Sequence, residues 1–575
     1  MGACWLRLVA LAALSGIFFS PQHCASREGR RKYPFMRSAT TAPKVSYYDY
    51  IIIGGGTAGC PLAATLSQNY TVLLLERGGS PYGNPNITDL ASFGVPLSDT
   101  SPASPAQRFI SQDGVINSRA RVLGGGTCLN AGFYTRASPL YVRDAGWDGR
   151  VVNESYEWVE QSVAFEPPMR QWQSAVRDGL LEIGVLPFNG FTYDHMEGTK
   201  VGGTIFDRQG HRHTAADLLR YADSTRITVL LHATVHRISF RVQGGSKPVA
   251  RGVLFRDASG GLHRAYLRYG QGNEIIVSAG ALGSPQLLML SGIGPEAHLR
   301  AHNISVVLDQ PLVGQGMSDN PMNAVFVPSP IPVEVSLIQV VGITSSGSYI
   351  EAASGENFGR GDPRNYGLFS PRIGQFSKVP PKERTPEALA KAIQLMDSLE
   401  DAELRGGFIL EKIMGPISTG FLELPTRDVN DDPLVTFNYF EDPRDLERCV
   451  EGMRIIERVI ESQAFSPFTY QNIAEEFLAN MSSRWPVNLL PKHVNSATPL
   501  EEFCRNTVMT IWHYHGGCQV GRVVDSDYKV IGVDSLRVID GSTFNYSPGT
   551  NPQATVMMLG RYMGIKMLRQ RLAAD

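Results

Sequence analysis

The amino-acid sequence predicts an α/β fold with more than one structural unit. Residues 47–77 read as strand, glycine turn, helix and strand, which is a βαβ unit of about 30 residues. Strand patterns return at 227–240 and 274–280, and the second leads into an apolar helical segment at 279–294. Because 575 residues are too many for one compact core, we expect two domains or one large composite fold.

The glycine turn of this βαβ unit carries the pattern of a dinucleotide-binding site. Gly54, Gly56 and Gly59 form G-x-G-x-x-G directly after a strand, and Glu76 ends the next strand about 20 residues later. Glycines let a pyrophosphate approach the helix N-terminus, and the acid can accept hydrogen bonds from ribose hydroxyls. The alternative is a glycine turn that only lets a helix pack closely on a strand. The combined context and spacing favour cofactor binding.

A second glycine cluster follows at 120–133, in the segment ARVLGGGTCLNAGF. Three consecutive glycines let backbone amides approach an anion or a planar ring without obstruction by Cβ atoms. Taken alone, the segment could equally be a tight loop.

The sequence pattern between about 328 and 505 differs from that of the preceding segments. Strands and loops alternate there, and one charged stretch at 381–404 is typical of a helix. We interpret this segment as a separate domain on the substrate side.

Two polar groups stand out near the C-terminus. His513 and His515 lie in an apolar setting, and if the chain is extended there their side chains point to opposite sides. One is then free for catalysis while the other is structural. Asn551 and Pro552 precede an apolar helix, which predicts Asn551 as the N-cap and Pro552 as the first helical residue. Such a helix end suits an anionic ligand, although an ordinary capped core helix explains the same residues.

Composition narrows the partners. Lys and Arg (53) nearly balance Asp and Glu (55), so no basic face for nucleic acid is expected and a small-molecule substrate fits better. The cysteines offer no C-x-x-C pair and no His/Cys cluster with metal-ligand spacing, so no metal site is expected.

The first residues predict secretion. Arg7 is followed by an apolar stretch that ends near Phe19, with small residues by Ala25, which is typical of a signal peptide over residues 1–25. A membrane anchor is the alternative, but the run is shorter than the roughly 20 residues that a span needs, and we expect no transmembrane segment. Glycosylation acceptor triplets, typical of secreted chains, begin at Asn86, Asn153, Asn303 and Asn480.

Together these motifs resemble the glucose-methanol-choline (GMC) oxidoreductase family over nearly the whole mature chain, and more closely its plant branch of HOTHEAD-like and mandelonitrile-lyase-like proteins. The resemblance rests on ARVLGGGTCLNAG, AGALGSPQLLMLSG, IWHYHGG and GTNPQAT, which occur in the family's order. It implies a Rossmann-like FAD-binding domain and a second, discontinuous substrate-binding domain. The expected parts are an FAD-binding domain at 45–327, with substrate-side insertions at about 140–230, a substrate-binding domain at 328–505, and a C-terminal part of the FAD-binding domain at 506–575.

The resemblance also implies a set of cofactor contacts. With the glycine motif, the expected FAD-binding residues are Gly54, Gly56, Thr57, Ala58, Gly59, Glu76, Arg77, Val122, Gly126, Asn130, Ala131, Gly132, Phe133, Val235, Trp512, His513, Gly541, Asn551, Pro552 and Gln553. Members with covalent flavin have a histidine where this chain has Leu129, so non-covalent FAD is expected.

The family's catalytic pair matches His513 and Asn551. His513 would take the hydroxyl proton while a hydride passes to flavin N5, and Asn551 would hold the substrate oxygen. Cys449 and Cys504 match a pair that forms a disulfide in the plant lyases.

Three functions follow from the resemblance. The leading one is oxidation of an alcohol, with a long-chain ω-hydroxy fatty acid as a candidate substrate and O₂ or another molecule as electron acceptor. The second is cyanohydrin cleavage to aldehyde and HCN, as in hydroxynitrile lyases. The third is a flavin-binding protein without turnover. We expect an extracellular protein, and a monomer.

Overall fold

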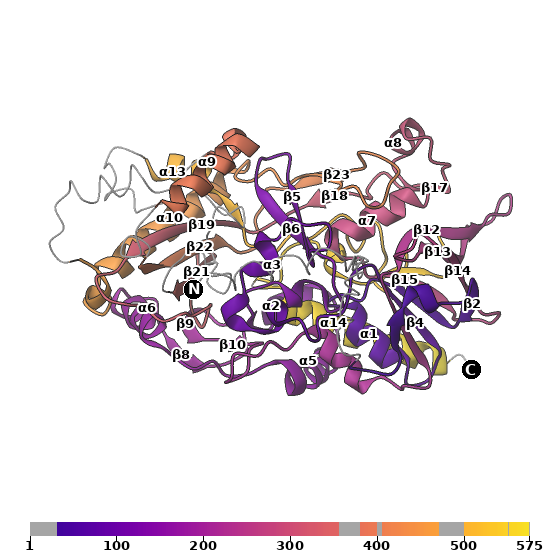
Figure 1. Ribbon diagram of the computed structural model, residues 1–575, viewed down its shortest axis with the longest axis horizontal. Helices are drawn as coiled ribbons and strands as arrows, with labels where there is room; N and C mark the ends of the chain where they lie inside the picture. Colours follow the sequence, from indigo (N-terminus) through magenta and orange to yellow (C-terminus); the bar gives the residue numbers. More distant parts are fainter. Residues whose placement is uncertain (1–31, 356–379, 399–404, 471–498, 550, 574–575) are drawn as a thin grey trace, which may run out of the picture.

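The computed structural model describes residues 32–355, 380–398, 405–470, 499–549 and 551–573. The predicted leader and Asn480 lie outside these residues. Two large β-sheets lie next to each other along the long axis of the molecule, with β4 and β15 at one end and β19, β21 and β22 at the other (Figure 1).

The first sheet has six parallel strands and contains the predicted βαβ unit. Its strand order is β1-β11-β4-β3-β15-β26. The strands span Met36–Ser38 (β1), Ile227–Leu231 (β11), Val72–Glu76 (β4), Tyr50–Ile53 (β3), Glu274–Val277 (β15) and Leu536–Val538 (β26). Helix α1 (Gly59–Leu66) connects β3 to β4, as the sequence predicted. This sheet confirms the Rossmann-like fold class.

Both faces of this sheet are covered, which explains its continuous apolar strands. In β3, Ile52 faces the core made with α1, α5 (Gly149–Val163) and α14 (Gln553–Leu572). Its neighbours Ile51 and Ile53 face the opposite core. That second core is formed with α7 (Gly280–Leu290) and the four-stranded sheet β12-β13-β14-β2, at Thr234–Arg241, Val249–Arg256, Leu262–Leu267 and Val45–Tyr48.

The second large sheet has seven strands drawn from distant parts of the chain. Its order is β25-β19-β22-β21-β20-β9-β8. The strands span Met509–Thr510 (β25), Pro321–Pro328 (β19), Gly406–Ile413 (β22), Ser348–Gly355 (β21), Val340–Ile343 (β20), Gly198–Val201 (β9) and Phe188–Phe191 (β8). Segments of the two sheets therefore alternate along the sequence.

Two amphipathic helices, α6 (Gln171–Glu182) and α10 (Pro443–Glu461), pack on one face of the seven-stranded sheet. Cys449 of α10 and Cys504 of α13 (Leu500–Thr507) form a disulfide, which confirms the pair implied by the resemblance. The charged stretch at 381–404 contains helix α9 (Pro386–Asp397).

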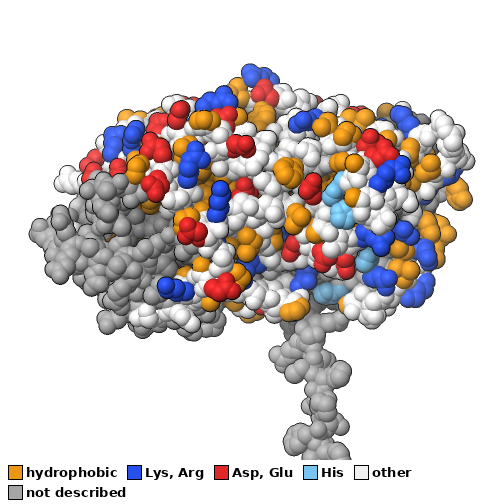
Figure 2. All heavy atoms as spheres, turned by 90° about the horizontal axis from the view of Figure 1, so that it is seen from above, with side chains coloured by type: hydrophobic (Ala, Val, Ile, Leu, Met, Phe, Trp, Pro, Cys, Tyr) orange, Lys and Arg blue, Asp and Glu red, His pale blue; other side chains and the backbone are white. Residues whose placement is uncertain are grey.

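The surface agrees with the near-neutral composition. On the face drawn in Figure 2, positive and negative side chains are interspersed over most of the surface. Across the portion of the chain with described coordinates, none of the helices has the length and apolarity to span a bilayer.

Candidate functional site

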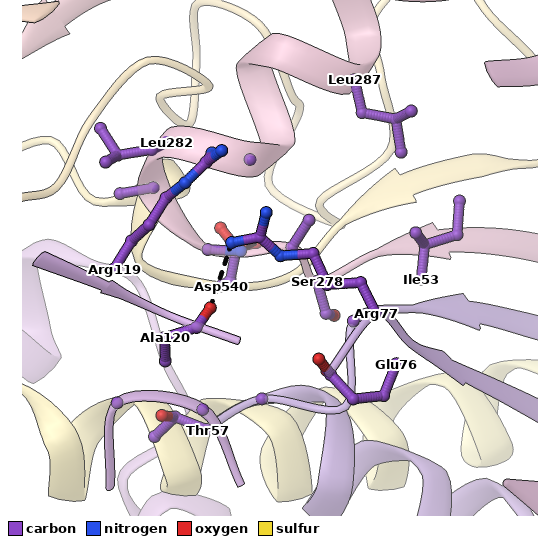
Figure 3. A pocket seen from close by; sticks show the side chains of 18 of the residues that line it. Ile53, Thr57, Glu76, Arg77, Arg119, Ala120, Ser278, Leu282, Leu287 and Asp540 are labelled. Atoms are coloured by element: carbon purple, nitrogen blue, oxygen red, sulfur yellow. Dashed lines mark hydrogen bonds between the residues drawn. The ribbon is translucent and has the colours of Figure 1, made fainter. Parts of the chain in front are cut away.

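The first cavity lies at the carboxyl ends of the parallel strands. It has a volume of about 250 Å³, and Ile53 at the end of β3, Glu76 at the end of β4, Ser278 after β15 and Asp540 after β26 line it (Figure 3). Ligands of open parallel sheets bind at this edge, between the strand ends and the N-termini of the following helices.

The three glycines of the first turn serve different purposes. Gly54 has a φ of +103°, in the region that favours glycine. A Cβ on Gly59 would lie 2.0 Å from the Gly54 carbonyl oxygen, so Gly59 permits close packing of α1. Gly59 is buried in the helix and does not line the cavity. Gly56 does line it, and a Cβ there would meet only Gly125 and Ser278 atoms at 3.8 and 4.0 Å.

Glu76 fixes the shape of the glycine turn. Its carboxylate accepts hydrogen bonds from the backbone N–H groups of Gly55 (2.9 Å) and Gly78 (2.7 Å). Burial raises the pKa of this carboxyl, and the two N–H donors oppose the rise. Each oxygen keeps a lone pair, so the ribose hydroxyl contact expected from the sequence is chemically possible.

Two arginines line the same cavity. Arg77 donates from Nη2 to the carbonyl oxygen of Ala120 (3.2 Å), as Figure 3 shows. Burial beside Arg119 lowers the pKa of Arg77 to about 9. Arg119 pairs with Asp432 (3.0 Å) and was not identified from the sequence. Both cations suit the phosphate end of a dinucleotide.

A second cavity adjoins the first and contains the predicted catalytic pair. Its volume is about 160 Å³, and it shares Thr57, Gly126 and Trp512 with the first cavity. His513 and Asn551 both line it. The walls are largely apolar, with Leu97, Leu129, Phe133, Ile338, Ile511 and Pro552 among them.

His513 is held by two neighbouring residues of one loop. Its backbone N–H donates to Oδ1 of Asp319 (2.9 Å), and its Nδ1 lies 3.1 Å from Nδ2 of Asn320. The chain is not extended here, because Trp512 has a φ of +59°. Burial, followed by the effects of the nearby Lys412 and His515, holds the pKa of His513 well below its usual range. The imidazole is therefore neutral at physiological pH.

His515 does not share the cavity of the catalytic pair. Its Nδ1 lies 3.0 Å from the carbonyl oxygen of His513, and the residue lines neither cavity. Burial lowers the pKa of His515 to about 4. The backbone of His515 also forms an antiparallel β-bridge with the backbone of Ser318, which agrees with a structural role.

Asn551 is oriented by a buried lysine. Nζ of Lys412 lies 2.6 Å from Oδ1 of Asn551 and 2.5 Å from Oε1 of Glu351. The side chains of Lys412 and Glu351 are each 1% exposed. An ammonium group can only donate, so Oδ1 of Asn551 must face Lys412. The amide Nδ2 is then the atom left for a ligand in the cavity.

The predicted cap at Asn551 is wrong by one position. Helix α14 begins at Gln553, Pro552 is its N-cap, and no side chain caps it. The Asn551 oxygen is used by Lys412, and a hydrogen bond from a charged donor is stronger than one from a backbone N–H.

The second glycine cluster is tied to this helix start. Nδ2 of Asn130 donates to Oε1 of Gln553 (2.9 Å), and Nε2 of Gln553 donates to the carbonyl oxygen of Phe133 (2.6 Å). Asn130 also accepts from the N–H of Gly132 (3.1 Å). The two bonds to Gln553 join segments more than 400 residues apart at the wall of the second cavity.

Most residues expected at the cofactor site line one of the two cavities. Those on the first are Gly54, Gly56, Thr57, Ala58, Glu76, Arg77, Val122, Gly126, Val235 and Trp512. Those on the second include Thr57, Gly126, Asn130, Ala131, Gly132, Phe133, Trp512, His513, Asn551, Pro552 and Gln553. Gly541 follows Asp540 and lines neither.

Sequence reasoning missed several lining residues. Ser278, Ala279 and Gly280 follow β15 as Gly54 follows β3, and the strand-to-helix transition there was the available signal. Lys412 lies beside Glu411 within an otherwise apolar strand, which is an unusual pattern for β22. Asn320 carried no signal of its own.

The cavities fit a flavin dinucleotide. Gly126 lines both cavities, its φ is outside the left-handed region, and a Cβ there would meet no heavy atom within 4 Å. Protein packing therefore does not require glycine at this position, whereas a ligand lying against the backbone does. Leu129 also lines the second cavity.

Comparison with known proteins identifies the family of the chain. The N-terminal and C-terminal parts described as GMC oxidoreductase match residues 48–322 and 416–560. The chain is 54% identical to Protein HOTHEAD of Arabidopsis thaliana, over 92% of this chain and 89% of that protein. It is 51% identical to an "(R)-mandelonitrile lyase-like" protein of the same plant, over 94% and 93%.

More distant matches include an alcohol oxidase. "Sinalpyl alcohol oxidase Nec3" of Nesocodon mauritianus is 41% identical, over 92% of this chain and 90% of that protein. Among solved structures, a formate oxidase matches with a TM-score of 0.71 at 18% identity, over 93% of this chain and 100% of that one. This structural likeness shows a shared fold.

Proposed function

Because the chain belongs to the GMC oxidoreductase family, we propose that it is an FAD-dependent enzyme that oxidises the hydroxyl group of a small-molecule alcohol. The observation that carries this proposal is the pair His513 and Asn551, which line one small cavity directly beside the cavity that fits the dinucleotide.

FAD, when bound, would supply the acceptor for the hydride of the carbinol carbon. His513 is neutral because burial and Lys412 oppose its protonation, so it can accept the hydroxyl proton of the substrate. Nδ2 of Asn551 can donate a hydrogen bond to the substrate oxygen as negative charge develops there. The walls of the cavity around these groups are largely apolar.

The lining also points to a class of substrate. The second cavity is bounded mainly by aliphatic and aromatic side chains, which favours an alcohol with an apolar carbon skeleton. We propose long-chain ω-hydroxy fatty acids as the first candidates, and O₂ or another molecule as the electron acceptor. Anaerobic mixing of the FAD-loaded protein with aliphatic and aromatic alcohols tests this: an effective substrate bleaches the flavin absorbance. If no alcohol in the panel bleaches it, the proposal fails.

One observation favours a second function, the cleavage of cyanohydrins. That reaction needs a base for the hydroxyl and positive charge for the departing cyanide. The buried ammonium of Lys412 beside Asn551 supplies a positive charge that an asparagine lacks. A lyase would release aldehyde and cyanide from mandelonitrile without bleaching the flavin.

We propose that FAD is bound without a covalent bond to the protein. Leu129 lines the second cavity and has no atom able to form the histidyl linkage. Acid precipitation should release all flavin into the supernatant. Flavin that stays with the precipitate would contradict this.

We also propose that the protein is secreted and glycosylated. Asn86, Asn153 and Asn303 are exposed, and the Cys449–Cys504 disulfide is typical of oxidising compartments. Intact-mass analysis of secreted material should give a chain that begins at residues 25–27 and carries N-linked sugar. An unprocessed chain without sugar would contradict this assignment.

A further inference from the structure

The ring of His513 has a side-chain partner on its far nitrogen. Nδ2 of Asn320 lies 3.1 Å from Nδ1 of His513 and 3.3 Å from Oγ of Ser547. Asn320 is fully buried, and its Oδ1 has no hydrogen-bond partner among the described residues. The carboxamide therefore contacts the ring through one of its two ends and leaves the other unused.

The end that faces His513 decides which ring nitrogen carries the proton. When the amide nitrogen faces Nδ1, it donates there, and the neutral imidazole must hold its hydrogen on Nε2. A nitrogen that already carries a hydrogen cannot take the substrate proton. When the amide oxygen faces Nδ1, it accepts the Nδ1–H, and Nε2 keeps a free lone pair.

The two orientations of Asn320 occupy nearly the same volume, because a half-turn about the Cβ–Cγ bond exchanges oxygen and nitrogen. After this half-turn, Oδ1 of Asn320 faces His513 and Ser547 and can accept a hydrogen bond from each of them. Nδ2 then lies where Oδ1 lay before, at the end of the amide that has no hydrogen-bond partner among the described residues. Neither orientation satisfies both ends of the amide. The contacts of Asn320 with other residues therefore do not select one orientation, and the hydrogen on Nδ1 of His513 is the group that distinguishes them.

Once His513 has taken a proton it carries hydrogens on both nitrogens, and only the oxygen of Asn320 can accept the one on Nδ1. We propose that Asn320 is a positioning residue, and that turnover uses the orientation in which its Oδ1 accepts from Nδ1–H of His513, leaving Nε2 as the base. This inference rests on the proposed alcohol oxidation.

The charged groups around His513 shape the pH dependence expected of variants. Lys412 of β22 and His515, which follows His513 by two residues, both oppose protonation of the His513 ring. Asp319 contacts the backbone N–H of His513, and its carboxylate also accepts from Thr510 and Tyr439, both at 2.6 Å. A new carboxylate at position 320 would be the only one facing the imidazole nitrogen itself among the described side chains.

Two substitutions separate the possibilities. Asn320→Asp keeps the shape and can accept but not donate, so it holds the proton on Nδ1 and raises the pKa of His513. The maximal rate of flavin reduction should stay within about tenfold of wild type, and its acid limb should move up by about one pH unit or more. Asn320→Leu removes the partner, and the maximal rate should fall roughly 10- to 1,000-fold with FAD retained.

Asn323→Leu is the matched control. Asn323 is also a buried asparagine, but it donates to Cys504 and Thr507 and does not contact His513. Its loss should lower thermal stability and leave the pH profile unchanged. An Asn320→Leu enzyme with the wild-type rate and profile would overturn the proposal.

A spectroscopic measurement tests the inference without turnover. In ring-¹⁵N-histidine-labelled protein, with the His513 signals assigned by comparison with His513→Ala, the Nδ1 signal should be that of a protonated nitrogen in wild type and in Asn320→Asp. A proton on Nε2 in wild type would refute the inference. If no alcohol reduces the flavin, the proposed function fails, but the ¹⁵N spectrum still decides whether Asn320 sets the tautomer.

Discussion

Nζ of Lys412 lies 2.6 Å from Oδ1 of Asn551, although the two residues are 139 positions apart and belong to different parts of the fold. Strand β22 of the seven-stranded sheet carries the lysine, and the asparagine lies just before Pro552, the N-cap of α14, which packs against the six-stranded sheet. This contact turns the amide N–H of Asn551 toward the second cavity. The two sheets thus build one site together.

Removing the lysine should disable Asn551. We expect Lys412→Met to lower the rate of flavin reduction by alcohol roughly 10- to 1,000-fold, because the amide is no longer oriented and a positive charge is lost. The single variant also leaves the Glu351 carboxylate buried without its cation, at a stability cost of roughly 3–5 kcal/mol.

The double variant Lys412→Met/Glu351→Gln separates the two effects. It removes both charges, so stability measured by thermal unfolding should largely return while turnover stays low. Recovery of turnover together with stability would show that the lysine acts only on the fold.

The two histidines should respond differently to truncation. His513→Ala should retain FAD and lose roughly two to four orders of magnitude in turnover, which is the usual contribution of a positioned base. His515→Ala should mainly lower the melting temperature, because His515 bonds the His513 carbonyl and lines neither cavity. Stopped-flow flavin reduction and thermal unfolding of both variants check this. The reverse pattern would show that the wrong histidine has been assigned.

Flavin binding should depend on the open space above Gly126. We expect Gly126→Val to lose FAD, because the added side chain would fill the space that both cavities share. Gly56→Val should have the same effect. Gly149→Val is a suitable control, since Gly149 is an exposed glycine with equally open surroundings far from the cavities. The ratio of flavin to protein absorbance measures the outcome, and full flavin content in Gly126→Val would argue against the proposed cofactor position.

The sequence predicted the local parts of this architecture well. The βαβ unit at 47–77 and the helix within 381–404 form from neighbouring residues, and periodicity reveals such elements directly. The seven-stranded sheet was harder, because β9 pairs with β20 and β19 pairs with β25, each across more than 100 residues, and no local pattern encodes such pairing.

The difference between local and long-range interactions also explains which features of the candidate site the sequence could predict. Glycine turns and the His513 segment are visible in sequence because their chemistry is local. The orientation of Asn551 depends on Lys412, and that of His513 depends on Asn320; both partners come from remote strands or loops. The error in the helix cap at Asn551 has this origin, since a distant ammonium group took the oxygen that a local rule assigned to the helix.

A buried carboxyl on the seven-stranded sheet, at Glu411 of β22, predicts a pH effect on stability. Glu411 is fully buried, neither oxygen has a hydrogen-bond partner among the described residues, and burial raises its pKa well above the usual range. Folding therefore favours the protonated form, so its contribution to stability is complete below the unfolded pKa and is lost as pH rises toward the folded pKa.

Glu411→Gln keeps the shape and removes the titration. Its free energy of unfolding should match wild type near pH 4 and exceed it increasingly at higher pH, by up to about 1.4 kcal/mol per pH unit. Chemical denaturation across the pH range measures this. An advantage that does not grow with pH would mean that Glu411 is ionised in the folded protein.

The chemistry at Asn551 decides between oxidation and cyanohydrin cleavage. The most direct measurement compares wild type and Asn551→His with mandelonitrile and with long-chain alcohols, following flavin absorbance and cyanide release under anaerobic conditions. We predict that at least one alcohol bleaches the flavin of the wild type, and that efficient cyanide release requires a second histidine. Rapid cyanide release by the wild type, with no alcohol able to reduce its flavin, would contradict the proposed oxidoreductase function.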